Sequence, residues 1–266
     1  MAKQPMSAEE MLCQKDLKEL RKALEELAGL RFDGLSLPKV ALVQFEPSQV
    51  GTLVGTLMDA CLPFLPGIPD VGITKHEGIL GEREGYPDYR HRLGFRLELK
   101  LLYLDNPAIP MKKPPTPREP SARVTQKVTV KNVDPDKDVL LVIAYRLEEN
   151  DLDPPGCSPA IIDLGLFPMA HIVAARDQRM VEAGGRWFGE YETPTIPSRK
   201  GRLKLSRGEP LDVSAYGRKE AEGRDLNEDT NFGKLKRIPW GPLQGFLKKH
   251  GASYTKSGSS SDAWPD

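Results

Sequence analysis

Cysteine and histidine are scarce in this chain, with 3 and 4 residues among 266. Cys13, Cys61 and Cys157 lie far apart, and an odd number of isolated thiols does not build a disulfide framework. The sequence also lacks the paired Cys and His spacing of a zinc site. These absences predict reduced thiols, a cytoplasmic location and no structural zinc.

Long apolar runs are lacking as well. No stretch approaches the roughly 20 residues that a transmembrane helix needs. The N-terminus has no basic segment followed by an apolar stretch and a small-residue cleavage site, so we expect neither a membrane partner nor secretion. Hydrophobic residues make up 39% of the chain and charged residues 29%, a balance typical of a folded protein with a polar surface.

The chain as a whole has no excess of positive or negative charge, since it holds 38 Lys or Arg and 38 Asp or Glu. This balance hides an asymmetry, because residues 199–256 contain 14 basic and 7 acidic side chains. A basic C-terminal region beside an acidic body fits a protein that meets phosphate on one face. An ordinary solvated surface explains the same charges equally well.

Helical periodicity is clearest near the N-terminus. Ser7 and Glu10 form a capping box, and leucines recur at helical spacing from there to Gly29. This leucine stripe favours packing against a core or against a second copy of the chain. Further helices are predicted at 49–62, 176–183 and 239–250. Gly51 and Gly55 weaken the first of these or let another element pack closely against it.

Strand patterns occupy the middle of the chain. Residues 95–104 alternate between apolar and charged side chains as far as Lys100. The next position on the charged face is the apolar Leu102. This pattern predicts a strand that is buried on both faces at its end. Further apolar runs lie at 139–147 and 161–174. The order of helices and strands predicts a mixed α/β fold in one domain, residues 1–256, with 257–266 as a flexible tail.

Three charged residues lie within the first of these strands and just before it. Side chains two apart on a strand point to the same face, so Glu98 and Lys100 project together. The short bend at 90–94 allows an antiparallel hairpin that returns Asp88 beside Glu98. A surface hairpin with an ordinary Glu98–Lys100 ion pair is the alternative.

Two carboxylates that converge on one point repel each other unless a cation lies between them. Hard oxygen ligands suit Mg²⁺, with Mn²⁺ as a substitute. We therefore expect Asp88 and Glu98 to hold the metal in a site that takes its other ligands from water and phosphate. Lys100 is placed to hold or deprotonate an attacking water and to stabilise developing negative charge.

Pro87-Asp88, followed after nine residues by Glu98-Leu99-Lys100, resembles the signature of the PD-(D/E)xK nucleases, whose members include type II restriction endonucleases. The resemblance covers residues 86–100. It implies a restriction-endonuclease-like α/β fold, with a mixed sheet flanked by helices. It also implies Mg²⁺ on Asp88 and Glu98 and assistance to the nucleophile from Lys100. No Gln-x-x-x-Tyr helix, Walker loop or cysteine cluster accompanies it, which favours a restriction enzyme over a repair nuclease.

Restriction enzymes of this kind commonly use one more acidic residue upstream, and four glutamates are candidates: Glu46, Glu77, Glu82 and Glu84. Contact with double-stranded DNA requires residues that reach phosphates and base edges. The candidates for DNA binding are Arg176, Gln178, Arg179, Arg199, Lys200, Arg202 and Lys204. Both strands of a symmetric DNA site are most simply cut by a two-fold dimer, so we expect a homodimer.

Two other functions stay open from the sequence. In the first, the chain is a non-catalytic DNA-binding or regulatory protein, and the hairpin is only structural. In the second, it is a repair or other PD-(D/E)xK nuclease, or a hydrolase of RNA or small phosphoesters. The leading hypothesis is a Mg²⁺-dependent, site-specific endonuclease that hydrolyses phosphodiester bonds in double-stranded DNA.

Overall fold

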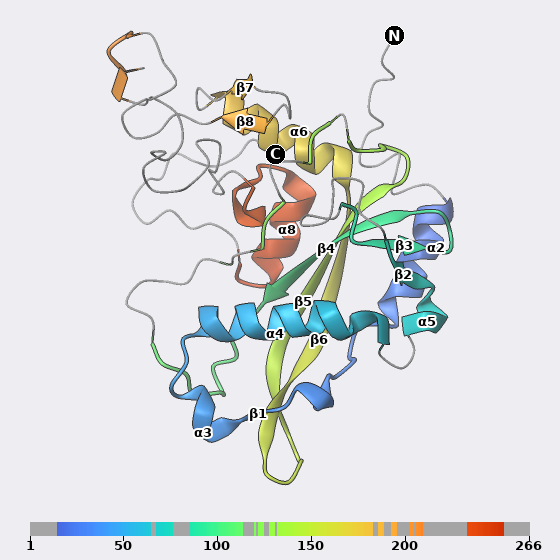
Figure 1. Ribbon diagram of the computed structural model, residues 1–266, viewed down its shortest axis with the longest axis vertical. Coiled ribbons are helices and arrows are strands. Elements are labelled where there is room, and N and C mark those ends of the chain that lie inside the picture. Colours follow the sequence, from blue (N-terminus) through green and yellow to red (C-terminus); the bar gives the residue numbers. More distant parts are fainter. Residues whose placement is uncertain are drawn as a thin grey trace.

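A six-stranded mixed sheet forms the centre of the computed structural model (Figure 1). The structure describes residues 15–64, 68–76, 86–113, 120, 122–124, 128–130, 132–182, 186–188, 193–195, 203–204, 206–209 and 233–252. The strands of the sheet are β1 (Leu37–Pro38), β2 (Ile73–Lys75), β3 (Tyr89–His91), β4 (Arg96–Tyr103), β5 (Asp138–Asn150) and β6 (Gly156–Pro168). Two further strands, β7 (Arg186–Phe188) and β8 (Thr193–Thr195), form a separate antiparallel ribbon.

The strands of the large sheet follow the order β1-β6-β5-β4-β3-β2. Strands β4 and β5 run parallel, and the other four neighbouring pairs are antiparallel. A parallel pair cannot be joined by a tight turn, so the chain makes a long crossover from residue 104 to 137. The expected mixed α/β class is confirmed.

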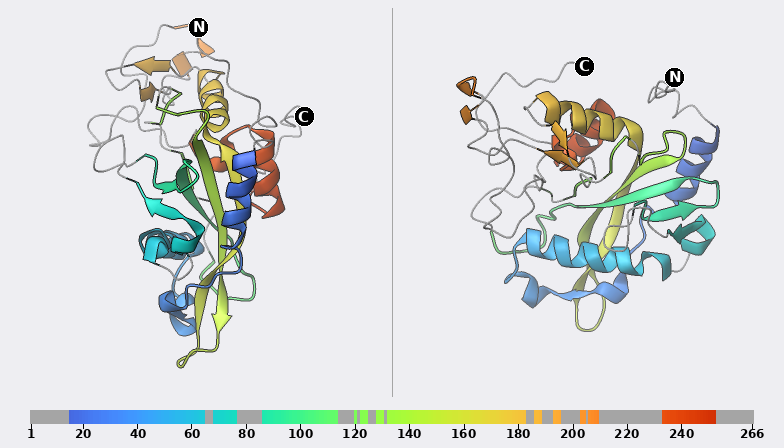
Figure 2. Two further views of the ribbon diagram at one scale, coloured as in Figure 1. Left: turned by 90° about the vertical axis from the view of Figure 1, so that its right-hand side faces the viewer. Right: turned by 45° about the horizontal axis from the view of Figure 1, so that its top comes forward.

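Helices cover both faces of the sheet, and Figure 2 shows α4 and α8 on its opposite sides. The longer helices are α2 (Lys15–Glu25), α4 (Pro47–Cys61), α6 (Met169–Glu182) and α8 (Gly241–Lys249). The short ones are η1 (Asp33–Leu35), α3 (Lys39–Leu42), η2 (Leu62–Phe64), α5 (Ile68–Val71) and η5 (Leu235–Arg237). None of the helices in the described part of the chain is long and apolar enough to cross a bilayer.

Two buried clusters lie on the two faces of the sheet. The first joins α2 and α4 to one face, and the second joins α6 and α8 to the other. Strand β4 contributes to both, since Leu99 and Tyr103 belong to the first cluster and Leu102 belongs to the second. The strand predicted at 95–104 is confirmed, and so is its burial on two faces. Strand β5 extends the run predicted at 139–147 and is buried in the same way.

The leucine stripe of α2 packs inside its own chain. Its members are at most 3% exposed and belong to the first cluster: Leu17, Leu20, Leu24 and Leu27. The stripe therefore serves the core, and not a contact with a second copy. The predicted capping box at Ser7 and Glu10 lies outside the described residues, as does the tail at 257–266.

The two glycines of α4 bring this helix close to the sheet. A methyl group at Gly51 would lie 3.0 Å from Cδ1 of Tyr103, and one at Gly55 would lie 3.2 Å from Oη of Tyr145. The hydroxyl of Tyr145 donates a hydrogen bond to the carbonyl of Gly51, at 2.9 Å. Close packing is therefore the reason for these glycines in a helix.

The third apolar run is divided between two elements. Strand β6 continues to Pro168, and α6 starts at Met169, so the helix begins before the predicted 176–183. Proline has no N–H for a sheet ladder and its fixed φ suits the entry to a helix, which explains the change of structure there. The predicted helix at 239–250 is confirmed as α8.

A buried ion pair fastens the starts of β4 and β5. Asp138 is 1% exposed and lies opposite Arg96 in the parallel ladder. Its carboxylate accepts hydrogen bonds from Nε and Nη2 of Arg96, from the hydroxyl of Tyr86 at 2.5 Å, and from the N–H of Asp134 at 2.9 Å. The segment that leads into Asp88 is thereby tied to the same point, since Tyr86 lies two residues before it.

Replacing Asp138 should destabilise the fold strongly. We expect Asp138→Ala to lower the free energy of unfolding by about 3–5 kcal/mol, because the change leaves Arg96 and Tyr86 without a buried acceptor. Urea denaturation followed by circular dichroism measures this difference. The matched control is Glu148→Ala, which breaks the half-buried pair with Arg146 and should cost at most about 1 kcal/mol. Equal losses in the two variants would contradict the anchoring role.

Candidate metal-dependent active site

The predicted hairpin is present and brings Asp88 to β4. Strands β3 and β4 pair antiparallel with Tyr89 opposite Leu97, so Asp88 continues the ladder beside Glu98. The Asp88 carboxylate accepts a hydrogen bond from the N–H of Leu99 at 2.8 Å. At the bend, Gly94 has φ +89°, a conformation that side chains disfavour.

Lys100 joins the two carboxylates. Its Nζ lies 2.6 Å from Oε1 of Glu98 and 3.8 Å from Oδ2 of Asp88, and it donates a further hydrogen bond to the carbonyl of Leu99 at 2.9 Å. The side chain of Glu98 is 4% exposed and that of Lys100 is 18% exposed. The three residues predicted from the sequence thus form one cluster, largely screened from water.

One oxygen of this cluster has no partner. Oε2 of Glu98 is buried and accepts no hydrogen bond from any residue that the structure describes. A buried carboxylate oxygen without a donor carries a large desolvation penalty, which a proton or a cation removes. Burial raises the pKa of Glu98 to about 7; the nearby Lys100 ammonium lowers it and the Asp88 carboxylate raises it.

The other two groups respond to the same surroundings. Burial raises the pKa of Asp88 above its ordinary value, although Lys100 and the Leu99 N–H act against the shift. Burial by itself would lower the pKa of Lys100, but Glu98 and Asp88 raise it above the usual value. A lysine held in its charged form favours binding a water or stabilising negative charge over removing a proton.

A third acidic residue, Asp59, approaches the cluster from the last turn of α4. Its Oδ1 accepts a hydrogen bond from the Tyr89 hydroxyl at 2.6 Å and lies 3.5 Å from Nζ of Lys75. Its charge is close enough to contribute to the raised pKa of Asp88. The sequence reasoning missed Asp59, although it is the one charged residue in the whole of 47–61.

Of the upstream acids named from the sequence, Glu46 does not take this position. Glu46 precedes the first turn of α4 and forms a capping box with Gln49. Asp59 is 13 positions further along the helix, or about 20 Å at 1.5 Å per residue. The remaining three candidates lie outside the described residues: Glu77, Glu82 and Glu84.

The cluster fits a magnesium ion that brings most of its own ligands. Among the described residues, no group of three or more His, Cys, Asp or Glu side chains is arranged to hold a metal. Mg²⁺ usually binds through one or two carboxylates and completes its shell with water and substrate phosphate. Asp88 and Glu98 offer two carboxylates, and the unpartnered Oε2 is a free ligand atom. Mn²⁺ accepts the same donors.

Arg176, the first of the predicted DNA contacts, is buried in the structure. Arg176 is 1% exposed; its Nη2 donates to the carbonyl of Val128 at 2.6 Å and its Nε to Asp177 at 2.8 Å. Its side chain is therefore buried inside the protein, and its assignment to DNA is corrected. A basic side chain near a helix start resembles a surface cation in sequence, and only tertiary packing reveals its burial.

The other DNA candidates are placed in part. Gln178 is exposed on α6, whereas Arg179 is half-buried and donates to the carbonyl of Arg237. Lys204 is half-buried in a short helical segment. Outside the described residues lie Arg199, Lys200 and Arg202. Their contact with DNA stays a prediction.

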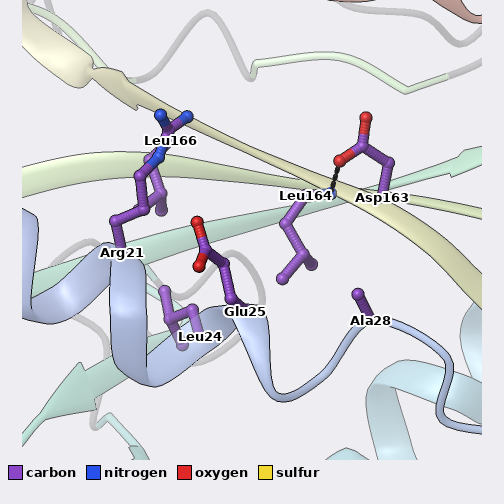
Figure 3. Close-up of a pocket in the computed structure, with 7 residues that line it drawn as sticks. All are labelled: Arg21, Leu24, Glu25, Ala28, Asp163, Leu164 and Leu166. Atoms are coloured by element: carbon purple, nitrogen blue, oxygen red, sulfur yellow. Dashed lines mark hydrogen bonds between the residues drawn. The ribbon is translucent and has the colours of Figure 1, made fainter.

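A separate hollow of about 240 Å³ lies between α2 and β6 (Figure 3). Its lining is partly apolar, with Leu24, Leu164 and Leu166. The acidic residue at its edge, Asp163, is already bound by Lys249 at 2.6 Å and His250 at 2.8 Å. The hollow therefore lacks the unpartnered ligand atom that marks the cluster around Glu98.

Comparisons of the chain with family models, with curated proteins and with solved structures find no match. The resemblance to PD-(D/E)xK nucleases thus depends on the short stretch 86–100 and on the geometry that the fold gives it.

Removing the charge of Glu98 should stabilise the metal-free protein at high pH. The carboxyl ionises near pH 4.5 when exposed but near 7 in the fold, so stability falls as the pH rises through this interval and stays lower above it. We expect Glu98→Gln to raise the free energy of unfolding at pH 8, in EDTA, by about 1–3 kcal/mol. The gain should vanish near pH 4, where Glu98 is protonated in both states.

Urea denaturation at several pH values measures this effect, with Glu148→Gln, at a half-buried carboxylate, as control. A Glu98→Gln protein that is less stable than wild type at pH 8 would show that Glu98 serves as a structural ion pair.

Proposed function

We propose that the chain is a Mg²⁺-dependent endonuclease that hydrolyses phosphodiester bonds in double-stranded DNA. The observation that carries the proposal is the unpartnered, buried Oε2 of Glu98 beside Asp88 and Lys100. An uncompensated carboxylate at this point costs stability, and binding a divalent cation offsets the cost.

The position of the cluster in the sheet supports a PD-(D/E)xK enzyme with a restriction-endonuclease-like fold. Strand β4 carries Glu98 and Lys100, β3 continues from Asp88, and β5 lies parallel to β4. Helices flank this mixed sheet on both faces. Within the class, a type II restriction enzyme that cuts at a specific site is the particular function we propose.

Each residue of the cluster has a distinct task in this proposal. Asp88 and Glu98 would hold the ion, and a bound Mg²⁺ supplies positive charge and a water of lowered pKa at the phosphate. Lys100 would donate hydrogen bonds to the attacking water or to a phosphate oxygen, a role that suits its raised pKa. Tyr89 holds Asp59 at the edge of the site through its hydroxyl.

The basic C-terminal region offers phosphate contacts. Lys248 and Lys249 are exposed at the end of α8, where Lys249 also pairs with Asp163. Contacts of this kind provide affinity and register on DNA without reading the bases.

Loss of the lysine should abolish cleavage without unfolding the protein. We expect Lys100→Ala to lower the rate of plasmid cleavage in Mg²⁺ by about 10²–10⁴-fold, because the charge that stabilises the phosphate is gone. Excess EDTA should stop the wild-type reaction. The control is Lys39→Ala, which removes an exposed ion pair with Glu149 and should cut at the normal rate.

Purified wild-type protein with varied plasmid and phage DNA provides the measurement. Discrete bands would support a site-specific enzyme, and a smear would indicate a non-specific nuclease. Cleavage by Lys100→Ala at the wild-type rate would refute the assignment of the site. Digestion of RNA or of a small phosphoester, with DNA intact, would point to a different metal-dependent hydrolase.

One observation favours a second function. Lys100 already lies between both carboxylates, as in a purely structural ion cluster. The chain would then be a DNA-binding protein without catalysis. This candidate predicts retention of DNA that weakens with salt and no cleavage in Mg²⁺ or Mn²⁺.

A further inference from the structure

A second lysine lies beside the candidate metal site. Lys75 is the last residue of β2 and pairs in the sheet with Tyr89, the first residue of β3. Asp88 directly precedes Tyr89, and its carbonyl accepts a hydrogen bond from the N–H of His76 at 3.0 Å, so the pairing continues one step further. Lys75 and Asp88 therefore lie at the same end of these two short strands.

The ammonium group of Lys75 is held on one side and open on the other. Its Nζ lies 4.3 Å from the centre of the Tyr89 ring and 3.5 Å from Oδ1 of Asp59. Asp59 is itself fixed by the Tyr89 hydroxyl, which donates to its Oδ1 at 2.6 Å and to its carbonyl at 2.9 Å. The side chain of Lys75 is still 52% exposed. Tyr89 and Asp59 thus keep a solvent-accessible cation at the rim of the site.

The two lysines of the site differ in how firmly carboxylates hold them. Nζ of Lys100 lies 2.6 Å from Oε1 of Glu98, and its side chain is 18% exposed. The pair of Lys75 and Asp59 is longer and both of its side chains are exposed, so it contributes little to stability. Lys75 can therefore exchange this contact for one with an incoming anion at small cost.

The charges of the site favour an anion at Lys75. Three carboxylates and two ammonium groups meet here: Asp59, Asp88 and Glu98, with Lys75 and Lys100. With all of them ionised, one bound Mg²⁺ leaves a single positive charge in excess, which matches the negative charge of a phosphodiester. Without Lys75 the metal-bound site would be neutral. Burial raises the pKa of Asp88, and Lys100 and, more weakly, Lys75 oppose this rise, so the charge of Lys75 is felt inside the site.

We infer that Lys75 binds the DNA phosphate next to the one that is cut, an inference that rests on the proposed nuclease function. Successive phosphates of one strand follow at about 3.4 Å along the helix axis. A strand whose reacting phosphate lies at Glu98 and Lys100 therefore carries a neighbouring phosphate past the rim. The lysine ammonium offers that phosphate a point charge with three donors. This contact provides affinity and register, and the bond-breaking step is left to Lys100 and the metal.

Cleavage kinetics of a supercoiled plasmid in Mg²⁺ test the contact. We expect Lys75→Ala to raise KM by about 5–20-fold, the effect of losing one partly exposed charged hydrogen bond, and to leave kcat within about twofold. Lys75→Gln, which keeps a polar side chain without the charge, should behave in the same way. Lys75→Arg keeps the charge and should return KM to within about threefold of wild type. The control is Lys39→Ala, which removes another exposed lysine from an ion pair and should leave both constants unchanged.

Salt dependence separates a phosphate contact from a structural ion pair. Filter binding of linear plasmid DNA, with Ca²⁺ in place of Mg²⁺, gives the slope of the logarithm of the binding constant against the logarithm of the salt concentration. Each phosphate contact contributes about 0.9 to this slope, so Lys75→Ala should make it shallower by about that amount. Lys39→Ala should not change it. A Lys75 that only supports Asp59 would leave the slope as in wild type.

A Lys75→Ala protein with the KM and the salt slope of wild type would overturn the inference. A lower kcat at unchanged KM would overturn it too, and so would a Lys75→Arg protein as defective as Lys75→Ala. Thermal unfolding of each variant verifies that the fold persists.

Failure of the nuclease proposal gives a different result. Wild type that retains DNA in every divalent ion without cutting it would refute catalysis, and the salt slopes would still decide the contact at Lys75. Wild type that neither cuts nor retains DNA would overturn both proposals.

Discussion

Strand β4 is covered on both faces, so each charge on it must meet an opposite charge inside the protein. Arg96 meets Asp138 at the start of the strand, and Lys100 meets Glu98 and Asp88 in its middle. Two cations thus face three carboxylates. The excess of negative charge affects Glu98 most: among the described residues no donor reaches its Oε2, and burial raises its pKa to about 7. The burial of β4 on both faces thus leaves its carboxylates one positive charge short.

Stability and the proposed activity therefore oppose each other at this point. The Arg96–Asp138 pair shares two hydrogen bonds and lies where β4 and β5 begin. The cluster of Asp88, Glu98 and Lys100 has two carboxylates for one cation. As the pH rises and Glu98 ionises, the cluster lowers the stability of the metal-free protein. A rigidly held backbone next to a charged group that lacks a full set of partners is typical of binding sites. There the ligand supplies the missing charge. The anchor holds the carboxylates close despite their repulsion.

Much of this site could be predicted from the sequence because its parts are local. A hairpin returns Asp88 to Glu98 over a short bend, and strand parity places Glu98 and Lys100 on one face. Asp59 could not be found in this way, since it reaches the site through the packing of α4 on the sheet. Arg176 was misassigned for the same reason, because burial depends on β5, α6 and distant segments and not on neighbouring residues. The start of α6 was missed because apolar runs in a buried strand and a buried helix look alike.

The glycines of α4 have a consequence for the effects of mutation. Gly51 and Gly55 hold the helix so near Tyr103 and Tyr145 that a larger residue would require the helix or the tyrosine side chains to shift. Asp59 lies on the same helix, about 6 Å along its axis from Gly55. A substitution at either glycine would thus displace an acid that it never touches. Substitutions at Gly51 or Gly55 would then show epistasis with substitutions at Tyr89, whose hydroxyl positions Asp59, although Tyr89 lies far from α4 in the sequence.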